Sequence, residues 1–456
     1  MIYFITKLIA RTALGLFFNR ISPANKENIP RHGPVIFVSN HPNTMIDPMV
    51  IIHVCGKKLS FFAKNTLFNT HLKRWFLGKL QIIPMYRTQD NPQSLNKNTD
   101  SFSAGFNILK NNGSFLIFPE GISTGERILH KIKTGAARIG LGAEAKFDWN
   151  LGITIIPVGL CYSDAVKFRS DVIVRFGPPI KVWDYKHAYE ANEFETVQLL
   201  TDKIKTAINK LTDNLKNIEL EEMVSGLEMI YKKELMVNLG LDINSKSDEF
   251  SVTKVLLSAV EWYFVNRPDK VEEFRTMLHK YLHHLDLLRL KDEYLDPSGK
   301  SASTWDRAKA LGYIVSGFPF YIYGLVNNVL PYEFPRWFAG RFARIKAEVA
   351  PTKLLAGTGI FIIIYTLEIF LIAYLSKSIF WTFLYIVCLI PSGNFVLTYV
   401  KKVRKYRQHL RFLSIFYRKR NLMYSLIKQR QDIINYLNHT REIYMKVANL
   451  KISDSD

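Results

Sequence analysis

The chain has 456 residues, 48% of them hydrophobic, and a formal net charge of +21 at pH 7. This length predicts two or three domains, and the charge predicts an anionic partner: nucleic acid, an anionic membrane or a phosphorylated substrate. The three cysteines, Cys55, Cys161 and Cys388, lie far apart, which excludes a disulfide framework and a cysteine zinc site.

The first twenty residues are apolar but contain Lys7, Arg11 and Arg20. These charges interrupt the continuous apolar run that a secretory signal peptide needs. We therefore expect residues 1–29 to contain an amphipathic helix that lies in a membrane interface.

Short apolar runs that are typical of buried strands follow along the chain. They lie at residues 35–38, 59–63, 81–86, 114–118, 153–160 and 171–176, with helical patterns at 101–109 and 134–145. Strands that alternate with helices predict an α/β domain over residues 30–190, built on a mixed sheet flanked by helices.

The first candidate site is the loop after the first of these strands, which contains His41, Asn43 and Asp47. A histidine is a suitable general base near neutral pH, and a carboxylate on its other ring nitrogen fixes its tautomer. Pro48 disfavours a helical Asp47, and residues six apart point from different faces of a helix, so the loop must bend for the two to meet. An ordinary solvated loop histidine is the alternative.

The second candidate site is the loop at residues 118–127, which contains Glu120, Gly121, Ser123 and Arg127. A strand that leads into a glycine-containing loop can offer backbone N–H groups to an anion, and arginine binds phosphate in a bidentate manner. The alternative interpretation of this segment is an ordinary turn followed by a solvated basic helix. Of two further predicted strands, one ends in Arg87 and the other contains Pro157. The alternative for each is an ordinary core strand.

Together and in this order, these four segments resemble the glycerophosphate acyltransferase family over roughly residues 30–180. The resemblance implies catalysis by His41 and Asp47, glycerol-phosphate binding by the second and third motifs, and an acyl-binding role near the fourth. In this sequence the matching positions are Arg87 in the second motif, Glu120 and Gly121 in the third, and Pro157 in the fourth. The resemblance further implies acyl-CoA or an acylated carrier protein as co-substrate, with no tightly bound cofactor and no metal.

Five residues separate His41 from Asp47, whereas four are common in the family. The longer loop resembles the glycerol-3-phosphate and dihydroxyacetone-phosphate acyltransferase branch of fungal type. The third motif reads Glu-Gly-Ile-Ser and not the Glu-Gly-Thr-Arg of many lysophosphatidate enzymes. The acceptor is therefore open between glycerol-3-phosphate and 1-acylglycerol-3-phosphate.

Residues 191–345 have a helical pattern. Within them, residues 312–330 are apolar but contain Pro319 and three glycines, so this segment could be re-entrant, interfacial or buried. The sequence gives no function for the region.

Two apolar stretches, residues 354–375 and 378–400, are each long enough to cross a hydrocarbon core of about 30 Å. Only a short connection separates them, so residues 346–402 predict a transmembrane hairpin, with helices of a soluble core as the alternative. Basic residues flank both ends, which predicts that the catalytic domain and the tail at 403–456 are cytoplasmic. Residues 401–456 carry 14 basic and 4 acidic residues, a pattern that attracts anionic membrane lipid.

The resemblance, together with the two apolar stretches, therefore implies a membrane-bound enzyme of phospholipid biosynthesis that transfers a fatty acyl group from a thioester to a glycerol-phosphate hydroxyl. One alternative is an acyltransferase for another lysolipid or an aminoacyl lipid. The other is a catalytically silent membrane protein that binds lipid. Nucleic-acid binding has no motif to support it.

Overall fold

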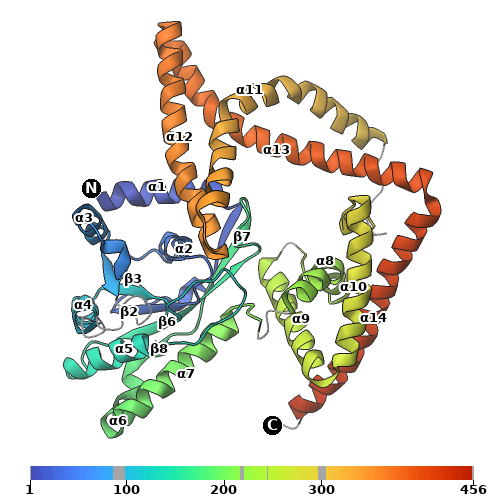
Figure 1. Ribbon diagram of the computed structural model, residues 1–456. Helices are drawn as coiled ribbons and strands as arrows, with labels where there is room; N and C mark the ends of the chain where they lie inside the picture. The colour runs from blue at the N-terminus through green and yellow to red at the C-terminus, as the bar shows by residue number, and fades with distance from the viewer. Residues whose placement is uncertain (1, 86–97, 216–219, 244, 296–303, 454–456) are drawn as a thin grey trace. The chain divides into compact units, whose positions relative to one another are not determined.

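The computed structural model describes residues 2–85, 98–215, 220–243, 245–295 and 304–453 (Figure 1). The chain divides into two compact units. Unit 1 comprises Met1–Lys216 and Pro335–Gly359, and unit 2 comprises Asn217–Phe334 and Ile360–Asp456.

The described part of unit 1 contains a mixed eight-stranded sheet. Its strands are β1 (Arg20–Ala24), β2 (Val35–Ser39), β3 (Leu59–Lys64), β4 (Ile82–Met85), β5 (Ser114–Ile117), β6 (Thr154–Tyr162), β7 (Asp171–Phe176) and β8 (Ile180–Lys181). The order is β1-β7-β6-β2-β5-β3-β4, with β8 on β6; the pairs β6–β7 and β6–β8 are antiparallel and the others parallel. The predicted mixed sheet and its six predicted strands are confirmed, while β1 and β8 were not predicted.

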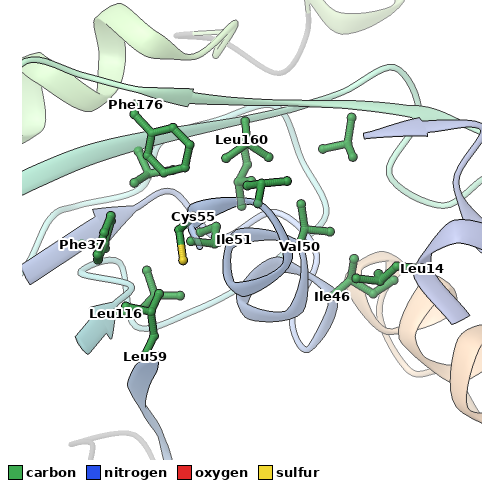
Figure 2. Close-up of a cluster of buried hydrophobic side chains, with 14 of the residues drawn as sticks. Leu14, Phe37, Ile46, Val50, Ile51, Cys55, Leu59, Leu116, Leu160 and Phe176 are labelled. Atoms are coloured by element: carbon green, nitrogen blue, oxygen red, sulfur yellow. The ribbon is translucent and has the colours of Figure 1, made fainter. Parts of the chain in front are cut away.

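Helices cover both faces of the sheet, which explains why its central strands are apolar throughout. One face packs on α1 (Ile2–Phe17) and α2 (Ile46–Cys55), and Figure 2 shows Phe37, Leu160 and Phe176 around α2. The other face packs on α4 (Asn98–Lys110), α5 (Gly135–Lys146) and α7 (Glu193–Leu211). Two shorter helices, α3 (His71–Lys79) and α6 (Lys186–Ala191), also belong to unit 1.

Helix α1 ends inside unit 1. Leu14, Phe17 and Phe18 are buried in the same core as α2, whereas Leu8 and Ile9 are more than 40% exposed. The chain then enters β1 at Arg20, which pairs in parallel with β7. The C-terminal end of α1 is thus part of the folded domain, and an interfacial position of its exposed N-terminal half stays a prediction.

The region predicted to be helical after the sheet consists of helices. In unit 2 these include α8 (Glu221–Asn238), α9 (Lys246–Asn266) and α10 (Pro268–Leu288). Outside that region, the predicted tail forms α14 (Arg420–Ser453). Buried Asp292 joins two of these helices, since it accepts hydrogen bonds from Tyr281 of α10 at 2.6 Å and from Arg430 of α14 at 3.0 Å.

Three long helices lie between α10 and α14 in the chain: α11 (Thr304–Phe342), α12 (Lys346–Ser376) and α13 (Ile379–Arg418). Among the described residues, α12 and α13 are the helices long and apolar enough to cross a membrane. In the most apolar 18-residue stretch of α12, 0% of the residues are buried, and in that of α13 29% are buried. A helix in the core of a soluble protein would be mostly buried. The basic residues 401–407 continue α13 as a helix.

Candidate active site

At the end of β2, a side chain takes the place of the next backbone partner in the sheet. Asn40 is buried; its Nδ2 donates to the carbonyl of Leu160 at 3.0 Å, and its Oδ1 accepts from the Leu160 amide at 2.8 Å. The side chain thereby continues the β2–β6 pairing by one residue. The main chain at His41 is free to turn away from the sheet.

His41 and Asp47 meet across this turn. Nδ1 of His41 lies 2.8 Å from Oδ2 of Asp47, and the Asn43 amide donates to the same oxygen at 2.7 Å. The loop bends as the two side chains require. The expectation that Pro48 keeps Asp47 out of a helix is wrong, because Asp47 lies in the first turn of α2, where a proline costs no intrahelical hydrogen bond. Asp47 has no solvent exposure. With the Nδ1 proton assigned to this bond, Nε2 of His41 can accept a proton from a substrate.

Tyr162 and Phe118 fix the pair from two sides. The Tyr162 hydroxyl donates to Oδ1 of Asp47 at 2.6 Å, and burial together with the Asp47 charge raises the pKa of Tyr162 well above its usual value. The phenol therefore stays a neutral donor. The Phe118 ring stacks on the imidazole, with centroids 3.9 Å apart. The side chain of His41 is 20% exposed, so substrate can reach it.

Glu120 joins the two candidate loops. Its Oε1 accepts from the His41 amide at 2.9 Å and its Oε2 from the His130 amide at 2.8 Å. Burial raises the pKa of this carboxyl, although the two amide bonds oppose the shift. Because each oxygen accepts a backbone hydrogen bond from a different loop, Glu120 ties the His41 loop to the segment at His130.

A small cavity lies beside the His41 ring. It is lined by Asn40, His41, Pro42, Glu120, Thr124, Glu126, Ile128 and His130. An acceptor hydroxyl that entered it would meet the imidazole. His130 contacts Thr124 at the same wall, with 3.1 Å between Nε2 and Oγ1.

Gly121 provides room for a lysine next to this cavity. Its φ is +67°, and a Cβ at this position would lie 2.7 Å from Nζ of Lys133. Lys133 is exposed, and its amide donates to the carbonyl of Pro119 at 2.9 Å. The structure thus places the ammonium group of Lys133, one of the basic residues that follow this loop in the sequence, against the Glu120 loop.

Other predicted residues hold the loops in place. Ser123 Oγ accepts from the Thr44 amide at 3.0 Å, and the buried Asn43 side chain donates to the carbonyl of Ala165 at 2.7 Å. Arg127 donates to Asp213 at 2.6 Å. Pro157 is buried in β6 beside Val38 of β2. Each of these four residues thus contacts another part of unit 1.

Arg87 lies outside the described residues. Strand β4 ends at Met85, and β2, β5, β3 and β4 are adjacent and parallel. Their carboxyl ends therefore share the edge of the sheet that carries His41 after β2 and Glu120 after β5, where α/β folds bind ligands. Tyr162 was missed because only the strand order brings it to Asp47.

We expect Glu120→Gln to loosen the two loops. The amide would keep one acceptor and turn an NH₂ group toward a backbone N–H, at a cost of about 1.5–3 kcal/mol for a lost charge-assisted bond. Thermal unfolding should show a lower Tm than in the partly exposed control Glu126→Gln. Equal Tm values for both variants would show that the carboxylate does not hold the loops.

Comparisons with known proteins agree with this geometry. Residues 20–161 match the family model described as Acyltransferase. The chain is 30% identical over 199 residues to glycerol-3-phosphate O-acyltransferase 2 of Saccharomyces cerevisiae, covering 43% of this chain and 25% of that protein. It is 31% identical over 143 residues to glycerol-3-phosphate O-acyltransferase 1 of the same yeast, covering 30% and 18%.

A solved structure, the 1-acyl-sn-glycerophosphate acyltransferase of Thermotoga maritima, is similar with a TM-score of 0.34 and 18% identity, over 46% of this chain and 79% of that one. The chain spans a quarter or less of the length of the two yeast relatives. The part of the chain that matches the acyltransferase family model, residues 20–161, is the part that holds the His41–Asp47 pair and the Glu120 loop.

Proposed function

We propose that this protein transfers a fatty acyl group from an acyl thioester to a hydroxyl of a glycerol-phosphate acceptor, as a step of phospholipid biosynthesis. The observation that carries the proposal is the buried Asp47 carboxylate on Nδ1 of His41, which leaves Nε2 as a base inside an acyltransferase-family domain. The names of the two yeast relatives favour glycerol-3-phosphate as the acceptor.

In the proposed reaction, Nε2 of His41 takes the proton of the acceptor hydroxyl as its oxygen attacks the thioester carbonyl. The C–S bond breaks, and the imidazolium returns the proton to the leaving thiolate. Asp47 stabilises the imidazolium between these steps. The products are an ester and a free thiol, so the step needs neither a covalent enzyme intermediate nor a metal.

A panel of acceptors tests the proposal. Purified protein is incubated with a donor, either acyl-CoA or acylated carrier protein. The acceptor is glycerol-3-phosphate, 1-acylglycerol-3-phosphate or glycerol. The released thiol and the lipid product are measured. We expect turnover with a phosphate-bearing acceptor. Equal turnover with glycerol would favour a different acyltransferase, and no turnover with any acceptor would favour a silent lipid-binding protein.

Arg87 and Lys133 are the proposed contacts for the acceptor phosphate. We expect Arg87→Ala to raise the KM for the acceptor by about tenfold or more and to leave the KM for the donor within about twofold, because a charge-assisted contact is worth roughly 1.5–3 kcal/mol. Measuring KM for each substrate separately checks this. A similar rise in both KM values would assign Arg87 a structural role.

The first turns of α12 support a position at a membrane. Ala350 and Leu354 are buried in the core that contains α2, and the carbonyl of Ala347 accepts a bond from Thr44 Oγ1 at 3.2 Å, three residues after His41. The proposed membrane-crossing helix thus begins on the catalytic loop itself. We propose that α12 and α13 cross as a hairpin with unit 1 on the cytoplasmic side, where lipid products partition into the bilayer.

This membrane proposal predicts that the full-length protein stays in the membrane pellet after alkaline carbonate and after 1 M salt, because apolar spans are not released by charge screening. Immunoblots of pellet and supernatant measure the distribution. Release by either treatment would show that the two helices lie on the surface or in a soluble core.

A further inference from the structure

Helix α11 has an apolar outer face along most of its length. Six residues at helical spacing are each more than 40% exposed: Leu311, Val315, Phe318, Ile322, Val326 and Leu330. Soluble proteins rarely expose so long an apolar stripe. The apolar exposed faces of α12 and α13 adjoin it in unit 2, so the same solvent, lipid hydrocarbon, would cover all three.

Two polar residues of α11, Asn327 and Asn328, form hydrogen bonds with the other two helices. Asn328 is 1% exposed; it donates to Ser392 of α13 at 3.1 Å and accepts from Tyr365 of α12 at 2.6 Å. Asn327 accepts from Tyr385 of α13 at 2.8 Å. This arrangement, apolar outside and hydrogen-bonded polar groups inside, is what a bilayer requires and the reverse of a surface helix in water.

Contacts along α11 show where its two ends lie relative to the hairpin. Near its start, Lys402 lies 3.8 Å from the ring centroid of Tyr313, at the basic end of α13. In the middle, Asn328 reaches Tyr365, about 16 Å along α12 from Leu354 and so near the centre of a bilayer. Near its end, Pro335 packs on Gly357, which lies on α12 only three residues after Leu354. The helix therefore approaches the middle of the hairpin and returns.

Chain connectivity requires the same path. Among the described residues before α11, no helix is long and apolar enough to cross a membrane. After α11, Ala347 and Leu354 contact the catalytic domain. If α11 crossed the bilayer, these residues would lie on the far side from that domain. Pro319, Pro331 and Pro335 remove backbone donors inside α11, so the helix can bend at these positions.

We propose that α11 is a re-entrant helix that enters and leaves the bilayer on the catalytic side, with its outer face in lipid hydrocarbon and its asparagines bonded to the hairpin. This inference rests on the proposed hairpin of α12 and α13 and is independent of the acyl-transfer reaction. The membrane segment of the protein then has three helices, of which two cross.

Site-directed labelling tests the path. Full-length protein in which Cys55, Cys161 and Cys388 are replaced by alanine receives one new cysteine at a time and is reconstituted in sealed vesicles with unit 1 outside. The ends of α11 are probed by Lys309→Cys and Arg341→Cys, and its outer face by Val326→Cys. Two variants at exposed positions serve as controls for the two sides of the membrane: Asp148→Cys in the catalytic domain and Lys377→Cys at the hairpin tip. A membrane-impermeant maleimide is added with and without detergent, and a membrane-soluble maleimide in parallel.

We expect both ends of α11 to label without detergent as extensively as Asp148→Cys, and Lys377→Cys to label only with detergent. Val326→Cys should resist the impermeant probe and react with the membrane-soluble one. Ends that label from opposite sides would show that α11 crosses. Val326→Cys labelling as fast as the ends would place the helix in water, and Lys377→Cys labelling without detergent would remove the hairpin. Each of these results overturns the proposal.

Discussion

Replacing His41 by glutamine is expected to lower kcat by about two to four orders of magnitude, the usual contribution of a general base. The glutamine amide can still donate to Asp47 and fill much of the space against Phe118, but it cannot accept the hydroxyl proton. The fold should survive, because the ring stacks at the rim of the site and is not part of the sheet core.

The matched control for this variant is His53→Gln, since His53 is exposed and lies at the other end of α2. Its turnover should stay within about twofold of wild type. Thiol release and thermal unfolding are measured for both variants. A folded His41→Gln protein with nearly wild-type kcat would remove His41 from the mechanism.

The second large effect is expected for Asp47→Asn. Three donors converge on this carboxylate, from His41, from the Asn43 amide and from Tyr162. The asparagine NH₂ group must face at least one of them, which leaves a buried donor without an acceptor at a cost of about 1–3 kcal/mol. It also frees the imidazole to take the other tautomer, for which a loss on the order of 10³–10⁴ in kcat is expected.

The exposed residue Asp148 supplies the control, Asp148→Asn, which should leave kcat and Tm unchanged. Single-turnover rates and Tm separate the catalytic loss from the stability loss. If Asp47→Asn lowered Tm but kept wild-type kcat, the carboxylate would only support the loop and would not orient the base.

The elements that sequence reasoning predicted are those whose signals are local. The six predicted strands are short apolar runs bounded by turn residues, and the spacing from His41 to Asp47 is read directly from one loop. Strand β1 has no such signal, since Arg20 and Pro23 interrupt it and its partner β7 is about 150 residues away. Its formation depends on a pairing that the sequence does not display.

The same limit applies to the site. The roles of Tyr162 and Glu120 depend on which strands are neighbours, because β6 brings Tyr162 to Asp47 and β5 brings Glu120 to the amide of His41. Arg127 matched the expectation for a phosphate ligand by residue type, yet it pairs with Asp213 from a separate segment. In α11, apolar packing against α13 keeps the helix continuous through Pro319, where the composition predicted an interruption.

The most direct test of the account is thiol release from acyl-CoA, followed with and without glycerol-3-phosphate on the purified wild-type protein. If His41 activates the acceptor hydroxyl, release requires the acceptor, shows no initial burst in its absence, and equals ester formation one to one. A burst of thiol without acceptor would indicate an acyl-enzyme and contradict the role assigned to His41. No release that depends on glycerol-3-phosphate or on 1-acylglycerol-3-phosphate, with either acyl-CoA or acylated carrier protein as the donor, would contradict the proposed function itself.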